Sequence, residues 1–209
     1  VATGTLLGAE HMRRLADEAT AASLVRKVPG LELHAFWRYS HNVAKLCRSF
    51  AGTLKLDPTA AYSAGLLHGI GLLTLHLLEP QAMAAVTARA AALDMKRARV
   101  ERRHLGFTFT QVSAALARHW QLPEAVITAL RYEHSPFDND AYEPLAGVLH
   151  LAAWRARAFE AELTDREMAV SFPDVVGLAL GMDIDMVLQQ EGIDWNAGAA
   201  NSASLGLLV

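Results

Sequence analysis

The sequence predicts an all-α protein, a bundle of many helices. Apolar residues recur at three- and four-residue spacing along most of the chain, and proline and glycine residues separate these stretches. No alternating strand pattern and no hairpin turn is evident. The 209 residues, of which 52% are hydrophobic, are enough for one domain with a sizeable core.

Five helices are expected in the first half of the chain, over residues 36–54, 59–68, 72–79, 81–92 and 96–105. Asp57 and Pro58 would end the first helix and start the second, because aspartate caps a helix and proline fits its first turn. Gly69 interrupts the apolar stretch between the second and third helices, since glycine is a poor helix former. Pro80 and Gly106 mark two further boundaries.

Five more helices are expected in the second half, over residues 108–120, 123–134, 142–162, 173–180 and 183–191. Phe109, Val112 and Leu116 share one face of the first of these. Pro123 suits the first turn of the next helix. That helix must end before Pro136, because the residue preceding a proline avoids the helical region.

The helices are expected to form one domain over residues 1–193. Residues 194–209 form a tail of small residues with an apolar end, a composition typical of a flexible linker. The chain opens with apolar residues already at helical spacing and without a cap. We therefore expect the chain to begin inside a larger domain.

Composition limits the classes of partner and compartment. The formal net charge of −3 gives no reason to expect a nucleic acid or an anionic membrane as partner. No stretch approaches the ~20 uninterrupted apolar residues of a membrane span, and the single cysteine, Cys47, lies in an apolar helical stripe typical of a buried thiol. These features predict a cytoplasmic protein. One local basic cluster is either a solvated helix face or an interaction surface: Arg97, Arg99, Arg102 and Arg103.

Three of the nine histidines stand out by their positions. His41 lies at the edge of the apolar stripe of its helix, and His68 immediately precedes the glycine break. His134 falls on the inward face of its predicted helix. A single helical histidine usually has a structural role, but three on separate helices could converge on one site.

Three stretches of the sequence resemble the HD-related output domain, HDOD, a helical relative of the HD phosphohydrolases: "FWRYSHNVAKLCRSFA", "AAYSAGLLHGIGLLTLHLLEP" and "ERRHLGFTFTQVSAALARHWQLPEAVITALRYEH". Their order and spacing are similar to the family's pattern, and the resemblance covers most of the chain. It implies an HD-like helical lobe. It also implies that most of the family's N-terminal helical lobe is missing from this chain.

The resemblance implies a comparison with the metal site of catalytic HD enzymes. In those enzymes a first histidine, a His-Asp pair and a distal aspartate surround divalent metals that activate water against a phosphoester. His41 and His68 match the two histidines, whereas Gly69 stands in the place of the aspartate of the pair. Since glycine has no side chain, the carboxylate that would bridge the metals is absent.

Other positions implied by the resemblance also depart from a catalytic site. Phe109 stands where many relatives have a histidine, and Glu133 and His134 replace a double histidine. The approximate place of the distal aspartate holds "HLAAWR", whose alanines cannot ligate. We expect no metal and no other cofactor; a retained metal would use His41, His68 and His134.

These features favour a bacterial signal-transduction domain that regulates through protein or small-ligand contacts and does not hydrolyse a substrate. The resemblance implies signalling partners, such as a receiver domain or a nucleotide-cyclase or phosphodiesterase domain in the full-length protein. Two alternatives remain open. One is a residual metal-dependent phosphohydrolase or phosphodiesterase, and the other is a sensor that binds a nucleotide in the same cleft.

Overall fold

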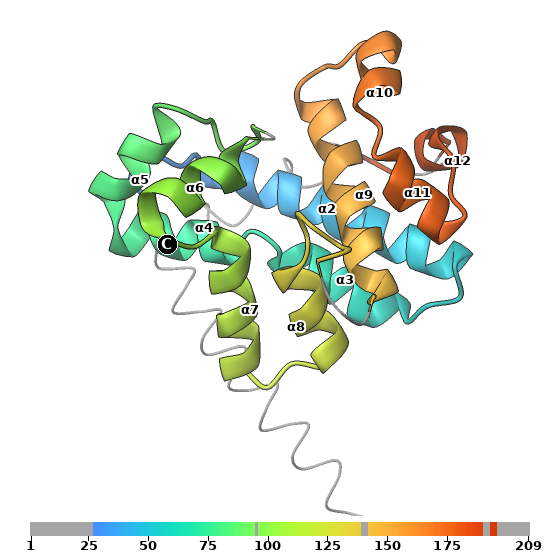
Figure 1. The fold of residues 1–209 in the computed structure, drawn as a ribbon, viewed down its shortest axis with the longest axis horizontal. Helices are drawn as coiled ribbons and strands as arrows, with labels where there is room; N and C mark the ends of the chain where they lie inside the picture. The colour runs from blue at the N-terminus through green and yellow to red at the C-terminus, as the bar shows by residue number, and fades with distance from the viewer. Residues whose placement is uncertain (1–26, 95, 139–141, 190–192, 196–209) are drawn as a thin grey trace, which may run out of the picture.

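The computed structural model describes residues 27–94, 96–138, 142–189 and 193–195. The regular elements in these ranges are all helices, and the predicted all-α class is confirmed. In chain order the helices are α2 (Leu33–Thr53), α3 (Pro58–Leu67), α4 (Ile70–Leu78), α5 (Pro80–Thr87), α6 (Arg97–Leu105), α7 (Phe109–His119), α8 (Glu124–Arg131), α9 (Pro144–Glu160), α10 (Asp165–Ser171), α11 (Asp174–Leu180) and α12 (Ile184–Leu188). Helices α4 to α6 lie on one side of the molecule and α9 to α12 on the other (Figure 1).

Helix α2 forms much of the core and packs against α3 and α9. Its first turn is capped by Glu32, whose carboxylate accepts hydrogen bonds from the backbone N–H groups of His34 and Ala35 at 2.9 and 2.6 Å. Helices α2 and α3 approach so closely that a Cβ on Gly65 would lie 2.6 Å from Cα of Ala44. Glycine is therefore required at this contact.

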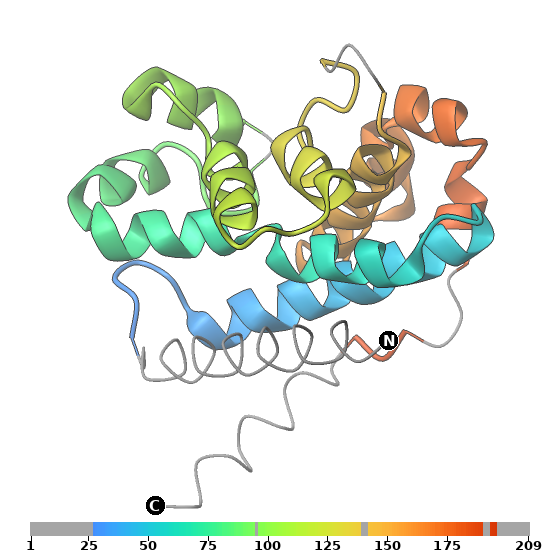
Figure 2. The ribbon, with the colours of Figure 1, turned by 90° about the horizontal axis from the view of Figure 1, so that it is seen from below.

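The apolar stretch Pro58–Leu78 is divided into α3 and α4 at His68 and Gly69, so that the two helices follow one another along the molecule (Figure 2). A side chain from α7 joins both sides of this break. The Ser113 hydroxyl donates to the carbonyl of His68 at 2.8 Å and accepts from the backbone N–H of Gly71 at 2.9 Å. The break is thus held by a neighbouring helix.

The same stretch, Pro58–Leu78, is a candidate membrane span within the described part of the chain. With 21 residues it is long and apolar enough to cross a membrane by length and composition. However, 56% of its 18-residue apolar window is buried inside the protein, and the stretch includes the buried side chains of His68 and His76. A core helix passes the same test, so the stretch is weak evidence for a membrane span.

Several helix boundaries differ from the predicted ones. Helix α5 ends at Thr87 rather than at residue 92, where the chain turns so that the Ala90 carbonyl accepts from the Arg97 guanidinium at 2.8 Å. Helix α8 ends at Arg131, and residues 132–134 form turns. Helix α10 was not predicted at all, although the capping pair Thr164 and Glu167 marks its start.

The main core lies between α2, α3, α8 and α9, and it contains Cys47. The Cys47 side chain is buried and forms no disulfide, so the prediction of a buried thiol is confirmed. Burial raises the pKa of this thiol well above its usual value, because the thiolate would be poorly solvated there.

Two residues of the predicted tail contact the body of the protein: the carbonyl of Asp194 accepts a hydrogen bond from Lys45 at 2.9 Å, and Trp195 contacts α2 and α9. The Trp195 ring stacks on Phe159 with ring centres 4.4 Å apart, and the Trp195 carbonyl accepts from Asn42 at 3.0 Å. Residues 196–209 lie outside the described part of the chain, as do residues 1–26. The flexible tail and the missing N-terminal lobe therefore stay predictions.

Candidate functional site

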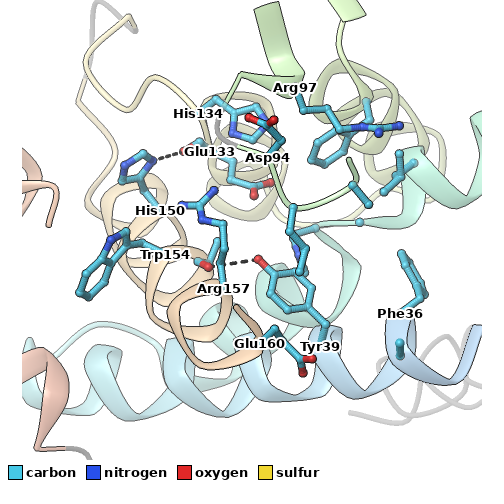
Figure 3. Close-up of a pocket in the computed structure, with 18 of the residues that line it drawn as sticks. Phe36, Tyr39, Asp94, Arg97, Glu133, His134, His150, Trp154, Arg157 and Glu160 are labelled. Carbon is cyan, nitrogen blue, oxygen red and sulfur yellow. Dashed lines mark hydrogen bonds between the residues drawn. The ribbon is translucent and has the colours of Figure 1, made fainter. Parts of the chain in front are cut away.

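A cavity of about 640 Å³ lies between α2, the break before α4, the turn after α8, and α9. Figure 3 shows its side chains. The structure brings five of the predicted positions to its wall: His68, Gly69, Phe109, Glu133 and His134. They come from three places in the chain, namely the break between α3 and α4, the start of α7 and the turn after α8.

His68 is a buried, neutral residue of this wall, with 3% of its surface exposed. Its Nδ1 lies 2.6 Å from the carbonyl of Gly65, which can only accept, so Nδ1 carries the proton and donates. Burial lowers the pKa of the ring to about 4, because the protein interior solvates the imidazolium poorly, although the Gly65 bond acts in the opposite direction. His68 is therefore uncharged at neutral pH.

Gly69 is closed off by an aromatic ring. A Cβ at Gly69 would lie 2.8 Å from Cε2 of Phe36, which is closer than side chains normally approach. The Phe36 ring therefore occupies space that a side chain at position 69 would need. The position has no carboxylate and cannot gain one without moving this ring.

The residue of α2 that faces His68 is Tyr39, and the prediction that His41 converges with His68 and His134 is wrong. Tyr39 lines the cavity and its ring packs edge-on against His68, with ring centres 5.4 Å apart. Its hydroxyl donates to the Ala153 carbonyl at 3.1 Å. His41 is two residues further along α2, about 200° around the helix, and does not line the cavity.

Sequence reasoning could have found Tyr39. It follows Phe36 by three residues and precedes Val43 by four, so it lies on the apolar stripe of α2, and His41 is off that stripe. Burial raises the pKa of the Tyr39 phenol, so this side chain stays protonated and acts as a hydrogen-bond donor.

Glu133 is a buried acid, with 3% of its surface exposed. Its Oε2 has no hydrogen-bond partner in the described part of the chain. Burial raises the pKa of this carboxyl to about 8, and the nearby positive charge of Arg157 only partly offsets the effect. Glu133 is therefore mainly protonated at neutral pH.

His134 and His150 complete the upper part of the wall in Figure 3. His134 packs edge-on against Phe109, with ring centres 5.2 Å apart, and lies in the turn after α8 rather than on that helix as predicted. His150 Nδ1 donates to the carbonyl of Glu133 at 2.6 Å. Burial lowers the pKa of His150, which favours the neutral ring.

The residues do not fit the metal set of a catalytic HD enzyme. At this wall α2 contributes Tyr39 rather than a histidine, Gly69 offers no side chain, and α9 contributes Ala153, whose methyl group cannot ligate. Among the residues described, no group of three or more histidine, cysteine, aspartate or glutamate side chains is arranged to hold a metal ion.

In the structure, one arginine of the predicted basic cluster is buried and the other three are exposed. Arg97 is buried, and its guanidinium donates to Glu101 at 3.0 Å, whose other oxygen accepts from the backbone N–H of Phe109 at 2.8 Å. Arg97 is therefore an internal residue and cannot belong to an interaction surface. The remaining arginines of the cluster are exposed beside one another, and their role as a surface stays a prediction: Arg99, Arg102 and Arg103.

The chain belongs to the HDOD family. The model of the HDOD domain matches residues 3–136, which is more than half of the chain and includes the break at His68 and the pair Glu133–His134. The resemblance of the sequence to the HDOD family is thus confirmed.

Known proteins share the fold or part of the sequence. A solved structure named "Putative phosphohydrolase" from Shewanella amazonensis SB2B superposes with a TM-score of 0.65 and 25% identity, over 88% of this chain and 64% of that one. A "Putative signal transduction protein" from Marinobacter aquaeolei VT8 has a TM-score of 0.63 and 23% identity, over 87% and 39% of the two chains, and shows the shared fold. A ribonuclease Y from Chlorobium luteolum is 36% identical over 83 residues, 37% of this chain.

The chain spans 20% and 16% of the lengths of the curated relatives it matches. The matching region is therefore one part of larger proteins.

Proposed function

We propose that this chain is a regulatory domain of a bacterial signal-transduction protein, and that it does not hydrolyse phosphoesters. The family membership and the neighbour named for signal transduction support the regulatory role. The domain would work in the cytoplasm, through contacts with signalling proteins or through a small molecule in its cavity.

The observation that carries the non-catalytic role is the packing around Gly69. The Phe36 ring fills the space beside Gly69, and the Tyr39 hydroxyl is bonded to the backbone of α9. Hydrolysis of a phosphoester by metal-bound water needs several charged or imidazole ligands held around one point. Here position 69 has no side chain, and the Tyr39 hydroxyl is already used in a hydrogen bond to the Ala153 carbonyl.

The test is a hydrolysis assay with metals supplied. The purified chain is incubated with Mn²⁺, Fe²⁺ or Mg²⁺ and either bis(p-nitrophenyl) phosphate or a cyclic dinucleotide, and the products are quantified. We expect no turnover above the protein-free blank. Turnover that disappears in a His68→Ala variant would overturn the proposal, because it would require a working site in this cavity.

Residual metal-dependent hydrolysis is the second candidate, favoured by the neighbour named as a phosphohydrolase. It would predict tightly held metal in the purified protein, lost in the His68→Ala variant. Elemental analysis therefore separates it from the regulatory role. A nucleotide sensor would instead show a higher melting temperature with a nucleotide present, because a ligand selective for the folded state stabilises it.

A further inference from the structure

Arg157 places a positive charge in the wall of the cavity, next to the carboxyl group of Glu133 (Figure 3). Its half-buried side chain lines the wall, and no hydrogen-bond acceptor or ion-pair partner for it occurs in the described ranges. Figure 3 shows the guanidinium between Glu133 and His150. A cation held in a partly dry cavity is poorly solvated and favours an anionic partner.

The other charged groups at the wall are already engaged. Glu160 forms a two-pronged ion pair with Arg38, at 3.1 and 2.7 Å. Arg97 is ion-paired through its Nε with Glu101 at 3.0 Å, although its Nη2 has no hydrogen-bond partner among the described residues. The two remaining acids are exposed and accept hydrogen bonds from backbone N–H groups: Glu32 and Asp94. Arg157 is thus the unpaired cation among the described wall residues.

A second, independent feature is the carboxyl group of Glu133. It is buried in the same wall, and its Oε2 has no hydrogen-bond partner in the part of the chain that the structure describes. A buried polar atom without a partner costs free energy, so such atoms in folded proteins usually meet a ligand or water. Glu133 and Arg157 therefore offer two adjacent polar groups to one occupant.

The rest of the cavity is apolar and aromatic. Phe36, Leu72 and Phe109 contribute to its wall, and its volume of about 640 Å³ falls in the ~300–1,000 Å³ range of small-molecule sites. An occupant therefore needs an apolar body as well as one charged end.

We propose that the cavity binds a small organic monocarboxylate, whose carboxylate pairs with Arg157 and bonds to Glu133 while its apolar body packs against the aromatic wall. One unpaired cation balances one negative charge, and the planar guanidinium matches a carboxylate with two parallel hydrogen bonds. A phosphate dianion would bring a second charge without a partner. This inference rests on the proposed regulatory function, for which the carboxylate would be the signal.

The test measures binding by calorimetry and by thermal shift with three probes: phenylacetate, indole-3-acetate and octanoate. We expect at least one to bind and raise the melting temperature, and its matched amide to bind at least about tenfold more weakly, as loss of a charge-assisted hydrogen bond implies. Arg157→Gln should weaken the carboxylate at least about tenfold. The matched control is Arg166→Gln, an exposed arginine outside the cavity, which should leave binding unchanged.

An Arg157→Lys variant shows whether weaker binding comes from the lost charge or from misfolding. It keeps the positive charge but loses the two parallel hydrogen bonds, so it should bind the carboxylate with intermediate affinity. Failure of all three carboxylates to bind would overturn the inference, as would unchanged binding in a folded Arg157→Gln variant. Tighter binding of phenyl phosphate than of phenylacetate would also overturn it. Hydrolysis in the metal assay would overturn the proposed function alone, so the two failures are distinguishable.

Discussion

Replacing Gly69 by aspartate would return a carboxylate to the place where catalytic HD enzymes carry one, and we expect it to destabilise this protein without creating a metal site. The new Cβ would start 2.8 Å from the Phe36 ring, and displacing a packed ring costs about 1–3 kcal/mol. A buried carboxylate without a partner adds about 1–3 kcal/mol. The free energy of unfolding should therefore fall by about 2–6 kcal/mol.

Two matched variants separate these contributions. Gly69→Ala introduces only the contact with Phe36 and should cost about 1–3 kcal/mol. Gly69→Asn has nearly the shape of aspartate but no charge. Burial raises the pKa of the new carboxyl above its unfolded value, so the folded state binds more protons and stability is lost as the pH rises. The difference between the aspartate and asparagine variants should thus be small near pH 4 and grow towards pH 7.

Urea denaturation at several pH values and elemental analysis of the purified variants provide the measurements. Because Tyr39 and Ala153 remain in place, Gly69→Asp alone should hold no stoichiometric manganese, iron or zinc. A Gly69→Asp protein as stable as the wild type and loaded with one of these metals would refute the reasoning about this wall.

Three further predictions concern stability. Gly65→Ala should lower the free energy of unfolding by about 1–3 kcal/mol, because the new Cβ would meet the α2 backbone, whereas Gly52→Ala, at an exposed α2 site with open space, should raise it by ~0.5–1 kcal/mol. Calorimetric melting of the two variants checks this, and equal effects on the free energy of unfolding would contradict it. Glu101→Gln should cost about 3–5 kcal/mol in urea denaturation because it leaves buried Arg97 uncompensated, and a loss below ~1 kcal/mol would argue against that pairing. His68 has a folded pKa of about 4, below its unfolded value of 6.5, so the unfolded state gains a proton first, and the free energy of unfolding should fall by up to about 3 kcal/mol as the pH falls from 6.5 to 4. His68→Asn should flatten this dependence of stability on pH, and an unchanged dependence would exclude His68 as its source.

Most of the helical fold could be predicted because its signals are local. The spacing of apolar residues and the positions of Pro58, Pro80 and Gly106 locate helices without knowledge of the tertiary structure. Helix α10 was missed because it has no buried residues and therefore no apolar stripe. Its only strong signal is the capping pair Thr164 and Glu167.

The site was less predictable because it depends on which side chains face each other across helices. The break itself indicates His68 and Gly69, and the apolar stripe of α2 favours Tyr39 over His41, but the contacts of Tyr39 with His68 and with the Ala153 carbonyl depend on how the helices pack. Arg97 shows the same limit. Its neighbours in the sequence are exposed, and only the tertiary contact with Ala90 and Glu101 makes it internal.

The Ser113 hydroxyl gives the break between α3 and α4 an unexpected mechanical property. It holds the carbonyl of His68 and the N–H of Gly71 with one oxygen, at 2.8 and 2.9 Å. A helix break is a natural hinge, and bending at this one would strain both bonds to α7. A displacement of α7 would likewise act on the backbone of His68 and of Gly71 together.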